Sequence, residues 1–163
     1  MSSAKGNLGE HLIMAELIHN GFHAFMADRD NPAFDIMILW PETGRKCAIR
    51  VKTTSNHSAI WTVKKSGAIF LDQQLSDDFV AIVDIGSGLR ERDVYLVETE
   101  SLLTDIQDAH SLYVSHPKKD GSPRKQEQGM RCIRFFGDDK PDNISYAFDR
   151  KYSKFKDAWG LLK

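Results

Sequence analysis

Three charged residues stand in two stretches that are otherwise typical of buried β-strands. Asp35 lies in the apolar run 34–40, and Arg50 and Lys52 lie in the run 47–53 that follows a short turn. Side chains alternate along a strand, so Arg50 and Lys52 share one face, opposite to the core-facing residues between them. A buried carboxylate is costly unless it is paired, hydrogen-bonded or bound to a metal. We therefore expect a β-hairpin in which Lys52 lies beside Asp35.

A second carboxylate belongs to the first predicted helix. Residues 7–20 fit a helix that ends at Gly21, whose freedom to adopt a left-handed conformation suits a helix end. Glu10 falls on the apolar side of this helix, near Ile13 and Leu17. One interpretation is a first-turn glutamate that interacts with the positive helix end, worth under ~1 kcal/mol. The other, which we favour, is a carboxylate that points into a site.

This arrangement resembles the PD-(D/E)XK nuclease superfamily, in particular its Holliday-junction-resolvase-like branch. The resemblance rests on Asp35, on the Val51-Lys52 pair in the next strand, and on the sequence Gly6-Asn7-Leu8-Gly9-Glu10, which matches a G-x-x-G-E helix of resolvase-like members. It implies that Asp35 and Glu10 bind Mg²⁺ or Mn²⁺ and that Val51 adds its backbone carbonyl. It also implies that Lys52 orients or activates the attacking water.

Arg50 departs from the family pattern, because it occupies the position of the second acidic metal ligand. At ~5 Å and an effective dielectric near 20, a guanidinium repels a divalent cation by roughly 6 to 7 kcal/mol before screening. We expect Arg50 to fork onto Asp35 or Glu10, to count among the catalytic-site residues, and to leave the native chain with weak or no Mg²⁺ binding. On that model, Arg50→Glu recovers metal binding. The alternative is that Arg50 turns to solvent or to a DNA phosphate and leaves the site open to metal.

The fold expected around these residues is a single α/β (α+β) domain spanning 1–163. The resemblance implies a restriction-endonuclease-like mixed central sheet flanked by helices. Strands are predicted at 22–27, 34–40, 47–53, 79–85, 94–97 and 130–136, a small hairpin at 60–63 with 68–71, and helices at 7–20, 99–109 and 151–162.

Composition limits the class of protein. The chain has 163 residues, 41% of them hydrophobic, and no apolar run approaches the ~20 residues of a membrane span. No secretory signal is evident, and Cys47 and Cys132 lack metal-binding spacing, so we expect a reduced cytoplasmic chain.

Charge is unevenly distributed. The net charge is −1, but residues 111–163 carry twelve basic and seven acidic residues. A long basic loop is predicted at about 116–134. We expect DNA contacts from this loop and from the polar run after the motif lysine, unless both are merely solvated. The candidate residues are Lys118, Lys119, Arg124 and Lys125 in the loop, and Thr53, Thr54, Ser55 and His57 in the polar run.

Three functions remain open from the sequence. The first is a metal-dependent DNA endonuclease that uses Mg²⁺ or Mn²⁺. The second is a catalytically inactive nuclease-fold module, without a cofactor, that binds DNA or another protein. The third is a protein-interaction or immunity-type partner that binds no nucleic acid. We expect DNA as the partner and no membrane, and a homodimer stays open.

Overall fold

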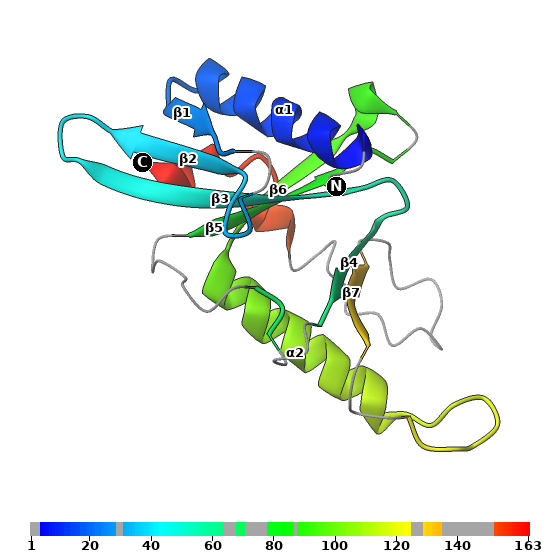
Figure 1. The fold of residues 1–163 in the computed structure, drawn as a ribbon. Coiled ribbons are helices and arrows are strands. Elements are labelled where there is room, and N and C mark those ends of the chain that lie inside the picture. Colours follow the sequence, from blue (N-terminus) through cyan, green and yellow to red (C-terminus); the bar gives the residue numbers. More distant parts are fainter. Residues whose placement is uncertain are drawn as a thin grey trace.

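The fold is built on a five-stranded mixed sheet with a helix on each face (Figure 1). The computed structural model describes residues 4–28, 31–63, 68–70, 78–86, 88–124, 129–134 and 152–163. In chain order the elements are α1 (Ala4–His19), β1 (His23–Met26), β2 (Ile36–Trp40), β3 (Arg45–Thr54), β4 (Ser58–Thr62), β5 (Phe79–Asp84), η1 (Leu89–Glu91), β6 (Asp93–Glu98), α2 (Thr99–Ser115), β7 (Met130–Arg134), η2 (Ser153–Phe155) and η3 (Trp159–Leu162).

The central sheet has the order β1-β2-β3-β5-β6, in which only β3 and β5 run parallel. The strands β2 and β3 form the predicted hairpin, with Ile36 opposite Ile49. The expected α+β fold with a mixed central sheet is confirmed.

Two apolar clusters hold the layers together. On one face of the sheet Ile13 and Leu17 of α1 pack against residues such as Ile49, and on the other face Leu102 and Ile106 of α2 belong to a second cluster. The buried residues of α1 are Gly9, Ile13 and Leu17, while Ile18 is exposed. Among the described residues, no helix is long and apolar enough to cross a membrane.

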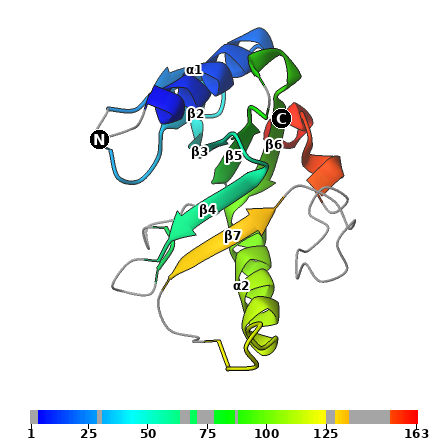
Figure 2. The ribbon, with the colours of Figure 1, turned by 90° about the vertical axis from the view of Figure 1, so that its right-hand side faces the viewer.

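The strand β4 does not pair as predicted. It forms a separate two-stranded antiparallel sheet with β7, where Ala59 lies opposite Ile133 (Figure 2). Both of these side chains are fully buried. Residues 68–70 are not in a strand, and residue 71 lies outside the described part of the chain. The predicted local hairpin is wrong because the backbone of β4 pairs instead with a strand about seventy residues later in the sequence.

The last two predicted helices also differ from the structure. The helix α2 continues to Ser115 rather than ending at 109, and its last turns expose Leu112 and Tyr113. The predicted C-terminal helix is instead two 3₁₀ turns, η2 and η3, separated by Asp157 with a positive φ of 49°. A non-glycine residue in that conformation interrupts a right-handed helix. Of the residues predicted to face the core, Tyr152, Trp159 and Leu162 are buried, and Phe155 is partly buried against the second cluster.

Candidate active site

A turn before β2 positions Asp35 at the edge of the hairpin. The amide oxygen of Asn31 accepts hydrogen bonds from the backbone of Ala33 at 2.8 Å and of Phe34 at 3.4 Å, which turns the chain before β2. The backbone of Asp35 then bonds to Ala27 on one side and to Ile49 on the other. Asp35 therefore lies one residue before β2, and the expectation that it sits inside the strand is wrong by that one residue.

The Asp35 carboxylate is fixed beside the middle of β3. Its Oδ2 accepts a hydrogen bond from the backbone N–H of Val51 at 2.6 Å. Burial raises the pKa of Asp35, and the negative charge of Glu10 raises it further, while the Val51 N–H and the charge of Arg50 oppose the rise. The net shift of the pKa is upward. A positive ion bound here would relieve both causes of that shift.

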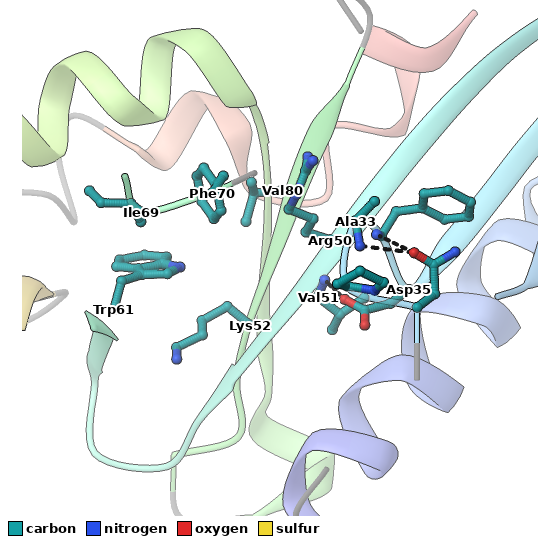
Figure 3. A pocket seen from close by; sticks show the side chains of 12 residues that line it. Ala33, Asp35, Arg50, Val51, Lys52, Trp61, Ile69, Phe70 and Val80 are labelled. Atoms are coloured by element: carbon teal, nitrogen blue, oxygen red, sulfur yellow. Dashed lines mark hydrogen bonds between the residues drawn. The ribbon is translucent and has the colours of Figure 1, made fainter. Parts of the chain in front are cut away.

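Lys52 lies in the same pocket as Asp35 (Figure 3). The pocket has a volume of about 250 Å³ and is lined by the charged residues Asp35, Arg50 and Lys52, together with apolar and aromatic side chains. The ammonium nitrogen of Lys52 is 5.7 Å from the centre of the Trp61 ring. Burial lowers the pKa of Lys52, so its amine is easier to deprotonate than a surface lysine.

Glu10 reaches this region because α1 packs closely on β3. A Cβ atom at Gly9 would lie 1.8 Å from Oγ1 of Thr53, so only glycine permits this approach. Glu10 follows directly and is close enough to Asp35 for its charge to raise the pKa of that carboxyl. Glu10 thus lies near Asp35, whereas the amine of Lys52, on the wall of the same pocket, points toward Trp61 (Figure 3).

Arg50 has a partner that the sequence did not reveal. Its Nη1 lies 3.2 Å from Oδ2 of Asp78, and the two side chains are only 11% and 2% exposed. Asp78 also accepts a hydrogen bond from the backbone of Ala48 at 3.3 Å. The expectation that Arg50 forks onto Asp35 or Glu10 is therefore wrong, because the guanidinium binds the buried Asp78, directly before β5.

Few groups in the pocket could bind a magnesium-like ion. Among the described residues, no group of three or more His, Cys, Asp or Glu side chains is placed to hold a metal. What is present is two carboxylates, Glu10 and Asp35, and the backbone of Val51. Since Mg²⁺ is commonly held by one or two carboxylates with water and substrate phosphate, this set fits such an ion.

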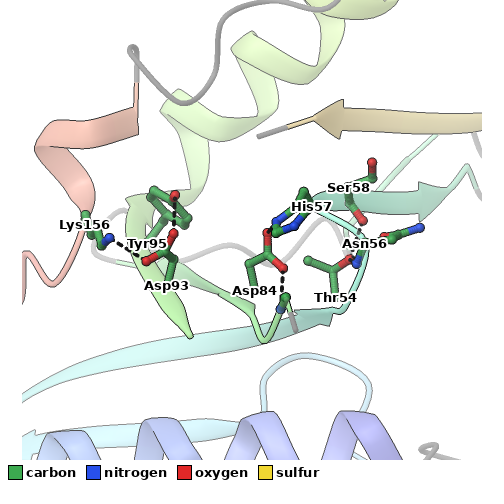
Figure 4. A network of polar contacts seen from close by, with 9 residues as sticks. Thr54, Asn56, His57, Ser58, Asp84, Asp93, Tyr95 and Lys156 are labelled. Atoms are coloured by element: carbon green, nitrogen blue, oxygen red, sulfur yellow. Dashed lines mark hydrogen bonds and ion pairs between the residues drawn. The ribbon is translucent and has the colours of Figure 1, made fainter. Parts of the chain in front are cut away.

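The polar run after Lys52 comprises the last two residues of β3 and the turn into β4 (Figure 4). The hydroxyl of Thr54, a buried residue, bonds to Asn56 at 2.8 Å and to the carbonyl of Ser58 at 2.7 Å, so it supports the turn and we leave it out of any DNA surface. Thr53 packs against Gly9 and its Oγ1 is buried. Because its hydroxyl is buried, Thr53 is not accessible to a DNA phosphate either.

The other two members of that run remain accessible. The Nδ1 of His57 is 2.8 Å from the buried carboxylate of Asp84, while about half of the imidazole is exposed. Ser55 accepts a hydrogen bond from Lys5 of α1. These contacts fix Ser55 and His57 at the same end of β3 as Lys52.

The basic loop lies elsewhere. Lys118 and Lys119 are exposed in a turn at the far end of α2 from the sheet (Figures 1 and 2). Arg124 stacks on Tyr113 at 4.1 Å and donates to the carbonyl of His116 at 3.1 Å. Lys125 lies outside the described residues. Residues 116–124, the part of the loop before β7 that the structure describes continuously, lie away from the Asp35–Lys52 pocket.

Asp78 and Asp84 are the polar residues that the sequence reasoning missed. Both are buried, one directly before the apolar strand β5 and one at its end. Acidic residues bounding a wholly apolar run are a signal that could have marked them as buried partners of cations.

Comparison with known proteins supports the fold. No family model and no curated protein matches the chain. A solved structure of a bacterial homing endonuclease, I-Ssp6803I, aligns with a TM-score of 0.54 over 97% of this chain and 90% of that chain, at 12% sequence identity. This chain and the homing endonuclease therefore have a similar, nuclease-like fold.

Proposed function

We propose that this chain binds DNA and carries a PD-(D/E)XK-type endonuclease centre built on Asp35 and Lys52. The observation that supports this most is the pocket in which the Asp35 carboxylate, held by the Val51 N–H, lies with the half-buried amine of Lys52. The fold shared with a homing endonuclease makes phosphodiester hydrolysis the reaction to test.

Each residue has a role that follows from its surroundings. Glu10, Asp35 and the carbonyl of Val51 would hold Mg²⁺ or Mn²⁺, and the ion would offset phosphate charge and acidify a bound water. The Val51 N–H orients the Asp35 carboxylate. Lys52, whose pKa is lowered by burial, positions the attacking water or accepts its proton. Ser55 and His57 would contact a neighbouring phosphate.

Cleavage of supercoiled and branched DNA with Mg²⁺ or Mn²⁺ tests the proposal. Native protein should nick these DNAs, and Lys52→Ala should not. Lys46→Ala is the matched control, because Lys46 is an exposed lysine on the same strand and its loss should leave nicking unchanged. Nicking that survives Lys52→Ala would overturn the assigned centre.

A second candidate is a nuclease-fold module that binds DNA or protein without cleaving. The observation that favours it is the buried Arg50–Asp78 ion pair at the position where the family pattern has a metal-binding acid. In that case native protein neither binds Mn²⁺ in a calorimetric titration nor nicks DNA. Its DNA affinity, if present, would still fall steeply with salt.

A further inference from the structure

The pocket beside Asp35 and Lys52 has a second, aromatic wall that phosphodiester hydrolysis does not use. Trp61 and Phe70 meet edge to face, with ring centres 6.5 Å apart and an interplanar angle of 83°. Ile69 lines the same cavity, which measures about 250 Å³. That is small beside the ~300–1,000 Å³ of pockets for drug-sized ligands, but suits one planar ring.

The aromatic wall is held in place from behind. The guanidinium carbon of Arg50 is 5.3 Å from the centre of the Phe70 ring, and Asp78 fixes that guanidinium at 3.2 Å. Both partners of the ion pair are largely buried. Arg50 is thus a positioning residue for Phe70, which gives the arginine a role that is separate from metal binding.

We propose that this pocket takes up an unpaired nucleobase of the DNA substrate, a claim that rests on the proposed function. The ammonium of Lys52, which lies over the Trp61 ring at 5.7 Å from its centre, suits the phosphate of a nucleotide, and the aromatic wall suits its base. A paired base hides its faces in the stack, so the pocket selects DNA in which a base is unpaired or can be turned out.

Binding to three DNAs in EDTA tests the proposal without cleavage. The DNAs are a paired duplex, the same duplex with one bulged adenine, and the same duplex with an abasic bulge. The two bulges distort the backbone alike and differ only in the base. By fluorescence anisotropy, native protein should bind the adenine bulge about tenfold more tightly than the abasic bulge. Equal affinities would overturn the proposal.

Two variants of the pocket and one control locate the effect. Phe70→Leu removes the ring and Ile69→Trp fills the cavity, so each should abolish the preference for the adenine bulge. If Phe70→Leu fails to fold, the affinities of Ile69→Trp for the two bulges decide whether the base enters this pocket. Phe25→Leu alters an exposed phenylalanine on β1 and should keep the preference. A preference that persists in the folded pocket variants would overturn the assignment.

The base pocket and the proposed endonuclease function can be refuted separately. Plasmid nicking that depends on Lys52, together with equal affinity for the two bulges, would remove the base pocket alone. Absence of binding to all three DNAs at low salt would remove both proposals.

Discussion

Replacement of Arg50 by glutamate should destabilise the fold rather than simply restore a metal ligand. The Arg50 Nη1 lies 3.2 Å from Asp78 Oδ2, and the side chains are 11% and 2% exposed. Glutamate would place a second carboxylate beside a buried one. Removal of one partner of a buried ion pair costs about 3–5 kcal/mol, which corresponds to a fall of roughly 2 M in the urea midpoint. Urea unfolding followed by circular dichroism measures this shift.

A second substitution separates stability from metal binding. Asp78→Asn keeps an acceptor for the Ala48 N–H, removes the competing charge and offers an amide donor to glutamate at position 50. The Arg50→Glu/Asp78→Asn variant should regain most of the lost stability and bind Mn²⁺ more tightly than native protein in a calorimetric titration. Lys46→Glu, a charge reversal at an exposed site on β3, should change stability by only about 0.5 kcal/mol. A native urea midpoint for Arg50→Glu would refute the reasoning.

Three further outcomes are expected. Gly9→Ala forces its Cβ against Thr53, so it should lower stability by about 1–3 kcal/mol and weaken nicking. Gly9→Ala/Thr53→Ala removes the worst contact and should recover part of both losses, and native behaviour of the single variant would contradict the packing. Burial raises the pKa of Asp35, so its ionisation costs folding free energy as pH rises through that pKa. Asp35→Asn should therefore gain stability relative to native protein between about pH 4 and neutral pH, and a loss in urea unfolding would contradict the shift. If the basic loop holds DNA, Lys118→Ala and Lys119→Ala should each reduce the salt slope of binding by about 0.9, and unchanged slopes would exclude the loop.

Strand periodicity was enough to predict the central hairpin and to place Asp35 and Lys52 on the wall of one pocket. The alternation that puts Lys52 on the face away from Ile49 is local, and a hairpin brings its own strands together. The first helix was likewise predicted from its apolar spacing and from Gly21 at its end, and Gly9 lies where that helix comes close to Thr53 of β3. These features needed no knowledge of distant contacts.

The features that were mispredicted depend on contacts between distant segments. Arg50 binds Asp78 because β3 and β5 pair in parallel, with Arg50 opposite Val80, and no local pattern gives that register. The pairing of β4 with β7 is equally remote. The aromatic wall at Phe70 follows from the same packing, so only its residue types were visible in the sequence.

The rate of DNA nicking under single-turnover conditions tests the central claim most directly. With Mn²⁺ and excess protein, Lys52→Ala should nick supercoiled DNA at least about 10²-fold more slowly than native protein, the usual contribution of a group that positions or deprotonates a nucleophile. Lys46→Ala should stay within about twofold of native protein, since surface substitutions away from a site are nearly neutral. Equal rates for native protein and Lys52→Ala would contradict the assignment of this pocket as the catalytic centre.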